Sequence, residues 1–150
     1  MQEKVFIHPE LGTFHLRLAL RLDWSEMDMF GHINNVMYAK YVQAARVNYW
    51  EMVGLNSMFN QSHEGPLLAS IQLQFKQPLF YPGNIAVWSK VKFIKNTSFG
   101  LTHIILNEKN EVCVISDDII VMFDFNKNEK IRVSDWMRKK IEEIENTTEL

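Results

Sequence analysis

A short polar segment ahead of a long apolar stretch holds the side chains best suited to chemistry. It contains, in order, Glu26, Asp28, Gly31, His32, Asn34 and Asn35. Asn and Asp are favoured N-cap residues, because a short side-chain acceptor satisfies an unpaired N–H of the first helical turn. A helix N-terminus also stabilises negative charge through its free N–H groups and its dipole. An acid and a histidine beside a helix N-terminus therefore indicate a hydrolytic site.

The stretch after these residues predicts a long helix from about Asn35 to Val53, with Gly54 as its terminator. At 100° per residue, its polar side chains fall within or on the flanks of an arc of roughly 80°: Lys40, Gln43, Arg46, Asn48 and Glu51. Most of the remaining circumference is apolar. We therefore expect a helix that is buried on most sides and wrapped by a broad element.

Strand patterns lie on both sides of this helix in the sequence. Apolar and polar residues alternate from Phe14 to Leu22, the pattern of a strand with one buried face. Residues 1–12 are predicted to be a lead-in, in which Pro9 and Gly12 break any regular element. Residues 55–66 are predicted to be a polar loop, and strands are expected at about 67–80, 85–95, 101–107 and 112–125.

The order of these elements predicts an α+β fold. The short turns between the last four strands indicate antiparallel pairing, and Ser134 is the predicted N-cap of a final helix over residues 135–145. A single antiparallel sheet curled around one apolar helix would bury both. The length of 150 residues predicts one domain, 1–150.

Composition excludes several functional classes. A hydrophobic fraction of 47% with 23% charged residues is typical of a soluble globular protein, and a net charge of −2 without a basic run argues against nucleic acid as a partner. No apolar run is long enough for a membrane span, and the first residues lack a signal-peptide pattern, so we expect a cytoplasmic protein. The single Cys113 excludes an internal disulfide and is expected in the core. The six glycines form no phosphate-binding motif, and no cofactor or metal is expected.

The segment from Glu26 to Tyr38 carries the motif E-x-D-x-x-G-H-x-N-N-x-x-Y. With the order of elements, it resembles the hotdog-fold acyl-thioester hydrolases, in particular the 4-hydroxybenzoyl-CoA thioesterase-like and long-chain acyl-CoA thioesterase branch. The resemblance covers roughly residues 13–133, and Phe75 and Pro78 match the F/Y-x-x-P stretch of that family. It implies a hotdog fold, in which the sheet wraps one long central helix, and an acyl-CoA thioesterase.

The resemblance also implies roles for individual residues. Asp28 matches the catalytic carboxylate, with Gly31 behind it, and His32 matches the histidine of the fatty-acyl branch. Asn34 and Asn35 match the paired asparagines at the helix start, where the backbone N–H of Asn35 would polarise the thioester carbonyl. The family implies a homodimer or homotetramer, since its sites lie between subunits and a lone sheet leaves an open edge.

Several alternatives stay open at the level of sequence. Asp28 could be a nucleophile or a general base. The carrier could be ACP instead of CoA, and a non-catalytic hotdog module that binds acyl groups or serves in assembly is the alternative from another class. Glu26 is interpreted as a supporting or solvated acid.

Two further groups of residues have less specific interpretations. Asp117 and Asp118 interrupt a predicted strand, and alternation would turn one of them inward unless a bulge intervenes. We interpret the pair as a solvated bulge or as a contact across a subunit interface. The remaining histidines lack metal spacing and are interpreted as ordinary surface or strand residues: His8, His15, His63 and His103.

Overall fold

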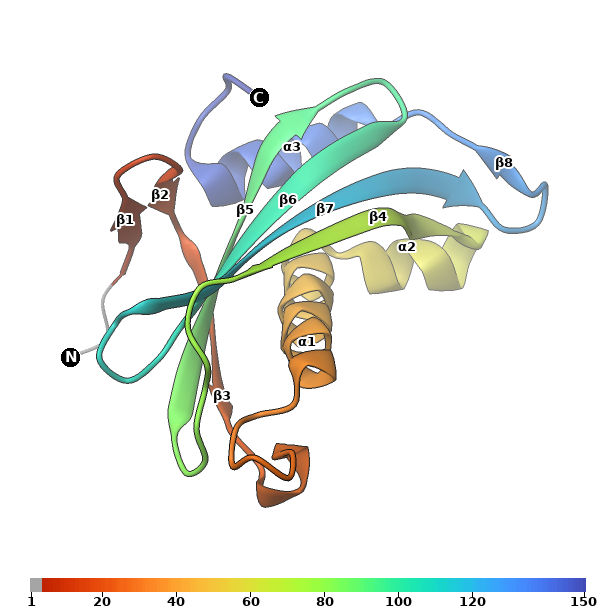
Figure 1. The fold of residues 1–150 in the computed structure, drawn as a ribbon. Coiled ribbons are helices and arrows are strands. Elements are labelled where there is room, and N and C mark those ends of the chain that lie inside the picture. Colours follow the sequence, from red (N-terminus) through yellow and green to blue (C-terminus); the bar gives the residue numbers. More distant parts are fainter. Residues whose placement is uncertain (1–3) are drawn as a thin grey trace.

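A curved antiparallel sheet forms the frame of the molecule, and helix α1 lies across its concave face (Figure 1). The computed structural model describes residues 4–150. The strands of this sheet, in spatial order, are β3 (Leu16–Arg21), β5 (Asn84–Ile94), β6 (Ser98–Leu106), β7 (Val112–Asp124) and β4 (Glu64–Phe75), with β8 (Glu129–Lys130) paired to the end of β7. Each of these pairs is antiparallel. The predicted α+β architecture, a hotdog-like sheet around one long helix, is confirmed.

Helix α1 (Asn35–Val53) has the predicted bounds. The side chain of Asn34 caps it by accepting a hydrogen bond from the Val36 N–H at 3.1 Å. Gly54 ends it with a φ of 93°, a left-handed conformation that favours glycine. The side chains that α1 buries face the sheet: Tyr38, Tyr41, Val42, Ala45, Arg46, Tyr49 and Val53.

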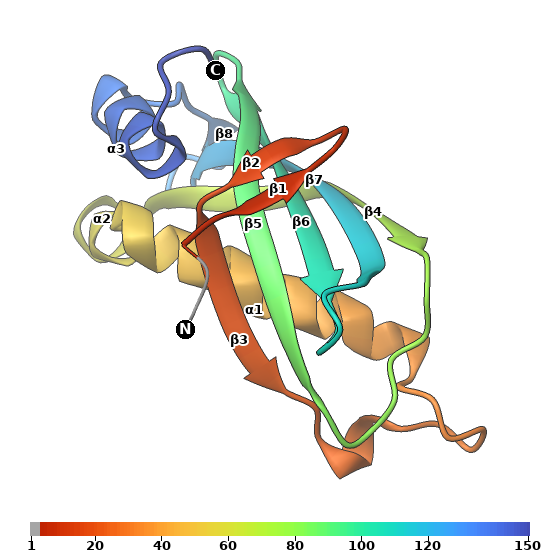
Figure 2. The same ribbon diagram turned by 90° about the vertical axis from the view of Figure 1, so that its left-hand side faces the viewer.

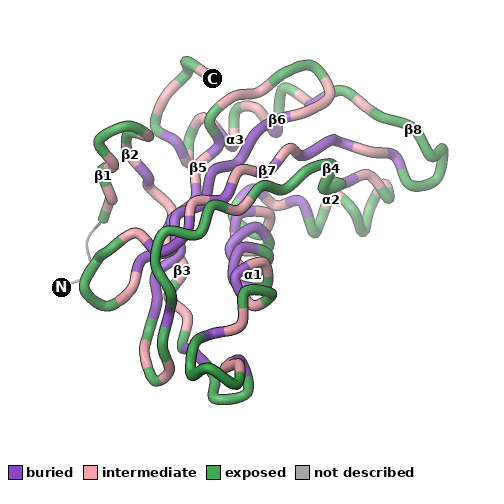
Figure 3. Tube along the Cα trace, in the orientation of Figure 1, coloured by how far each residue is buried: buried purple, intermediate pink, exposed green. Residues whose placement is uncertain are grey.

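The sheet buries a smaller part of the circumference of α1 than the sequence predicts. Val36, Val47 and Met52 are 63%, 42% and 56% exposed. Figure 3 shows the same one-sided burial of α1 and an exposed β4 at the sheet edge. The reason is geometric, because a single sheet contacts one face of a helix and leaves the other face open.

The N-terminal segment forms a hairpin where a lead-in is predicted. Strands β1 (Phe6–His8) and β2 (Gly12–Phe14) pair antiparallel, and residues 1–3 lie outside the described residues. The hairpin lies across the face of the sheet opposite α1 (Figure 2). There Phe6 packs against Phe14 and Trp88, which makes a second apolar layer and explains why the segment is ordered.

A helix also replaces the predicted loop at residues 55–66. Helix α2 (Leu55–Ser62) starts directly after Gly54. Leu55 is buried and Met58 packs against the core, so an i, i+3 apolar pair stabilises this short helix despite its polar residues. Strand β4 consequently begins at Glu64 and ends at Phe75; the other strand boundaries shift by a few residues.

Helix α3 (Asp135–Glu145) is confirmed with its predicted cap, since the Ser134 side chain accepts a hydrogen bond from the Met137 N–H. Its residues Met137 and Ile141 join the apolar cluster at the C-terminal end of α1. Cys113 is fully buried, as predicted. Within residues 4–150 no helix is both long and apolar enough to cross a membrane.

Candidate active site

Glu26 anchors the loop that precedes α1. It is 5% exposed, and its carboxylate accepts hydrogen bonds from the Asp23 N–H at 2.8 Å, the Tyr41 hydroxyl at 2.8 Å and Lys40 Nζ at 3.1 Å. Burial disfavours the charged carboxylate, but these donors outweigh burial and hold the pKa of Glu26 below its ordinary value. Glu26 is therefore a supporting acid that ties the loop to α1, and it is not solvated.

Asp28 sits in a tight turn that fixes one of its carboxylate oxygens. Asp28 Oδ1 accepts hydrogen bonds from the Phe30 N–H at 2.9 Å and the His32 N–H at 3.2 Å. The Asp28 N–H donates back to the His32 carbonyl at 2.7 Å. Gly31 adopts a φ of 83°, which a residue with a side chain rarely does, so it permits this turn. Both side-chain bonds end on Oδ1, and Oδ2 accepts no hydrogen bond from residues 4–150.

A pocket of about 350 Å³ opens beside this turn. Its lining residues are Asp28, His32, Ile33, Asn35, Tyr38, Phe75, Lys76, Gln77 and Pro78. Three of the five residues predicted for the site, Asp28, His32 and Asn35, thus meet at one cavity. The other two are not among its lining residues: Gly31 shapes the turn and Asn34 caps the helix.

His32 and Asn35 approach the pocket from different elements. The His32 ring is exposed and packs edge-on against Phe80, with ring centroids 4.9 Å apart. Asn35 is the first residue of α1, and the backbone N–H groups of a first helical turn have no acceptor within the helix. The pocket therefore brings together a carboxylate, an imidazole and the positive end of a helix.

No role is predicted from the sequence for the lining residues Ile33, Lys76 and Gln77, and Tyr38 is included only as the last residue of the motif. The Tyr38 hydroxyl accepts a hydrogen bond from the Leu79 N–H at 2.9 Å and so ties the β4–β5 connection to α1. Among the described lining residues, Lys76 is the one lysine or arginine. Lys76 and Gln77 lie between Phe75 and Pro78. Because Phe75 and Pro78 match the F/Y-x-x-P stretch of the family, that match could have pointed to the two residues between them.

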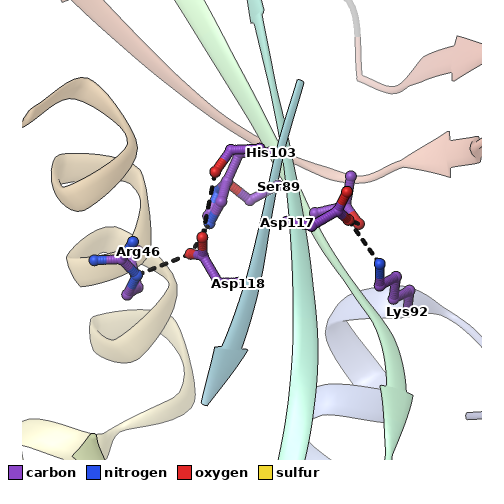
Figure 4. A network of polar contacts seen from close by, with 8 residues as sticks. Arg46, Ser89, Lys92, His103, Asp117 and Asp118 are labelled. Atoms are coloured by element: carbon purple, nitrogen blue, oxygen red, sulfur yellow. Dashed lines mark hydrogen bonds and ion pairs between the residues drawn. The ribbon is translucent and has the colours of Figure 1, made fainter. Parts of the chain in front are cut away.

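A second polar cluster lies under the sheet, between α1 and strands β5 to β7 (Figure 4). Asp118 Oδ2 accepts a hydrogen bond from Arg46 Nε at 2.9 Å and lies 2.8 Å from His103 Nε2. The other ring nitrogen, His103 Nδ1, is 2.7 Å from Ser89 Oγ. Ser89, His103 and Asp118 are at most 2% exposed and are not among the lining residues of the Asp28 pocket, so their side chains are closed to solvent although their types would suit nucleophilic catalysis.

This cluster corrects the interpretation of the aspartate pair and specifies the surroundings of His103. The aspartate pair is not a solvated bulge, because β7 keeps its register with β6 through both residues; alternation turns Asp118 inward onto Arg46 within the same chain, not across an interface. Asp117 points to the other face, where Lys92 Nζ donates to it at 2.6 Å. His103 lies on strand β6, as one of its two interpretations has it, and it is fully buried between Ser89 and Asp118.

Charge at this cluster follows from its hydrogen bonds. Burial raises the pKa of Asp118, but its hydrogen bonds and charge interactions with His103 and Arg46 together hold that pKa below its ordinary value. Asp118 is therefore ionised and neutralises Arg46. Neither here nor elsewhere among residues 4–150 is a group of three His, Cys, Asp or Glu side chains arranged to hold a metal ion.

The family of the chain follows from comparison with known proteins. The model of the thioesterase-like superfamily matches residues 22–141, which include the loop, α1 and the four long strands. The chain belongs to this superfamily. The predictions of a hotdog-fold thioesterase family and of a thioester hydrolase are thereby confirmed. The Asp28 pocket lies within the matched residues.

Individual relatives agree with this membership. The chain is 24% identical over 131 residues to the chloroplastic acyl-acyl carrier protein thioesterase ATL3 of Arabidopsis thaliana, covering 87% of this chain and 68% of that protein. Among solved structures, the DHNA-CoA thioesterase of Staphylococcus aureus superposes with a TM-score of 0.75 at 21% identity, over 87% of this chain and 92% of that one. A Thermus thermophilus thioesterase complexed with coenzyme A and Zn gives 0.79 at 16% identity, over 89% and 96%. At these identities, the two structures show the shared fold.

Proposed function

We propose that this thioesterase-superfamily chain hydrolyses acyl-CoA thioesters to a free acid and the CoA thiol. The observation that carries the proposal is the meeting of the Asp28 carboxylate and the α1 N-terminus at Asn35 in one pocket. Thioester hydrolysis needs a nucleophile and a stabilised oxyanion. It needs no strong acid, because a thiolate is a good leaving group. Two of the lining elements supply these two needs.

In this mechanism Asp28 acts through Oδ2, since Oδ1 is held by the loop. The carboxylate either attacks the carbonyl carbon and forms a mixed anhydride that water then hydrolyses, or removes a proton from the water that attacks. The backbone N–H of Asn35 receives the developing oxyanion, an electrostatic contribution that is often the largest in acyl transfer. His32 positions the water or donates a hydrogen bond to the carbonyl oxygen.

Lys76 gives the pocket a cation for the carrier. Both CoA and the phosphopantetheine arm of ACP bring phosphate to the mouth of the pocket, and an ammonium group there binds phosphate. We favour CoA as the carrier. We retain acyl-ACP as the second candidate because the Arabidopsis relative is named an acyl-ACP thioesterase. The ratio of hydrolysis rates on matched acyl-CoA and acyl-ACP thioesters distinguishes the two.

A second copy of the chain completes the proposed enzyme. Strand β4 is an open edge whose Leu67, Leu68, Ile71 and Phe75 are 42%, 40%, 39% and 54% exposed. Phe75 also lines the pocket, so a partner on β4 would enclose the site. We therefore propose a homodimer, or a homotetramer built from such dimers. In the same proposal the chain works as one domain in the cytoplasm, where its free and buried Cys113 stays reduced.

The decisive experiment is Asp28→Asn. The amide keeps the size of the side chain and an oxygen for the Phe30 and His32 N–H groups, so the fold should be retained. Thiol release from a series of acyl-CoAs, followed with a chromogenic thiol reagent, should fall by about a thousandfold or more. Asp117→Asn is the matched control, since it makes the same change on the opposite face of the sheet. Turnover near the wild-type level in Asp28→Asn would remove Asp28 from the mechanism.

The non-catalytic alternative has its own signature. If the wild-type chain releases no thiol from any acyl-CoA and no acid from acyl-ACP, while calorimetry detects acyl-CoA binding, the chain is an acyl-binding module. Hydrolysis of either carrier excludes that alternative.

A further inference from the structure

Arg46 carries a buried hydrogen-bond donor that no residue from 4 to 150 satisfies. Its Nε donates to Asp118, whereas its Nη2 is buried without an acceptor. Arg46 as a whole is only 8% exposed. In Figure 4 the other guanidinium nitrogens lie on the side of Arg46 away from Asp118. Because a buried unpaired donor is costly and rare, this N–H indicates a place built to receive an acceptor.

Arg46 lies on the stripe of α1 that leads from the candidate pocket. Asn35 and Arg46 are separated by about three helical turns, so they point to nearly the same side, about 16 Å apart along the axis. Long helical side chains lean toward the helix N-terminus. This tendency favours a guanidinium position on the pocket side of the Arg46 backbone.

The neighbouring wall along this stripe is apolar. Phe75 lines the pocket and packs against Tyr38, with ring centroids 5.3 Å apart. Further along β4, Leu73 packs on the core, and Ile71 pairs in register with Asp118, the partner of Arg46. Phe75 and Ile71 are both partly exposed. Phe75, Leu73 and Ile71 thus form an apolar row on β4 that leads from the pocket to the strand position opposite Asp118.

The negative charge of Asp118 beside Arg46 determines which kind of acceptor the Nη2 donor can bind. Asp118 already neutralises Arg46 and accepts its bond at 2.9 Å. A further carboxylate would lie beside the ionised Asp118 and would be repelled. A neutral oxygen, as in a hydroxyl or a ketone, satisfies the Nη2 donor without adding charge.

We propose that Arg46 determines substrate specificity by donating to a neutral oxygen near the distal end of the acyl chain. The preferred substrates are then hydroxyacyl or oxoacyl thioesters of medium length, and a plain chain that reaches Arg46 leaves its donor unpaired. This inference rests on the proposed thioesterase site, because it takes the Asp28 pocket as the position of the thioester.

The first test compares acyl-CoAs in pairs of equal length, with and without a hydroxyl at the last carbon. Given the distance of about 16 Å, chains of about eight to fourteen carbons span the relevant range. At one length the wild type should prefer the hydroxylated member by about tenfold or more in kcat/KM. Arg46→Lys keeps a cation for Asp118 and should stay folded, but it should lose the preference and retain hydrolysis of the shorter plain chains. No preference at any length in the wild type overturns the inference and leaves the thioesterase proposal standing.

The second test does not depend on hydrolysis. Calorimetry measures the binding of the free fatty acid and of its forms with a terminal hydroxyl or a terminal carboxylate. The hydroxy acid should bind about tenfold more tightly than the plain acid, and the dicarboxylic acid more weakly than the hydroxy acid. This order, observed in a chain that releases no thiol, supports the inference while the thioesterase proposal fails. Equal binding of all three acids overturns the inference.

Discussion

Glu26 and Asp28 stand two positions apart and have opposite surroundings. Glu26 is buried under three donors, whereas Asp28 lines the pocket and keeps one oxygen clear of the loop. The residue types alone do not distinguish the two acids. Their surroundings differ because Lys40 and Tyr41 on α1 donate hydrogen bonds to Glu26, whereas Asp28 lines the pocket.

Glu26→Ala should destabilise the chain by about 1–3 kcal/mol at pH 7, because it leaves the Asp23 N–H and the buried Tyr41 hydroxyl without an acceptor. The folded-state pKa of Glu26 is lowered. Its stabilising contribution is therefore present above its unfolded pKa and is lost as pH falls through its folded pKa.

Denaturant unfolding measured from pH 7 downward checks this prediction. The gap between wild type and Glu26→Ala should narrow in the acid range, and Glu26→Gln, which keeps an acceptor oxygen, should lose less than Glu26→Ala. A gap that widens at low pH would contradict the assigned role of Glu26.

At the scale of elements, α1 links the pocket to the rest of the structure. Its start presents Asn35 to the pocket, and its C-terminal half meets α3 through one buried acid. Glu145 Oε2 accepts hydrogen bonds from the Tyr49 hydroxyl at 2.7 Å and from the Val91 N–H at 2.8 Å. Burial raises the pKa of Glu145, so the attachment of α3 should depend on pH.

The sign of that dependence is the reverse of the sign for Glu26. A raised folded-state pKa adds stability below the unfolded pKa, and this stability is lost as pH rises through the folded pKa. Glu145→Gln removes the titration and keeps an oxygen for Tyr49 and Val91. The variant should therefore melt a few degrees above the wild type at pH 8.

Thermal melts at pH 8 and pH 4.5 measure this difference, and it should shrink or reverse at the lower pH. Glu142→Gln, on the same helix, is the matched control, and its effect should be small at both pH values. If Glu145→Gln and the wild type melt at the same temperature at pH 8, burial of the ionised Glu145 carboxylate does not destabilise the fold.

At the scale of the whole molecule, the open strand β4 and the uncovered flank of α1 leave apolar side chains exposed. Leu67 and Leu68 on β4 and Val47 on α1 are each at least 40% exposed. Exposed apolar groups on an edge strand indicate strand pairing with another chain. The proposed second copy would cover β4 next to the pocket.

Leu68→Lys should therefore disrupt the proposed assembly, because a charge on an edge strand opposes pairing. Light scattering should give a dimer or tetramer mass for the wild type and a monomer for the variant, and thiol release should fall by about tenfold or more. Ile7→Lys is the control, since Ile7 is 67% exposed on the hairpin away from β4. A wild-type monomer with full activity would refute the assembly.

What the sequence by itself determined rests on local signals. The bounds of α1 follow from the cap at Asn34 and the glycine at position 54, and α3 follows from Ser134 and its apolar stripe. The motif around Asp28 also predicts a shared site for Asp28, His32 and Asn35, and these three residues line one pocket. In each case the deciding partners lie within a few residues along the chain, so pattern and spacing can reveal them.

Only the tertiary structure decided the rest, because the partners there are distant in sequence. Arg46 and Asp118 are 72 residues apart, and the sequence pattern does not reveal that the two side chains meet when β7 packs over α1. Helix α2 and the β1–β2 hairpin consist of segments that look like loops, and they are ordered through apolar contacts with the core and the sheet. Lys76 likewise reaches the Asp28 pocket only because β4 ends beside the start of α1.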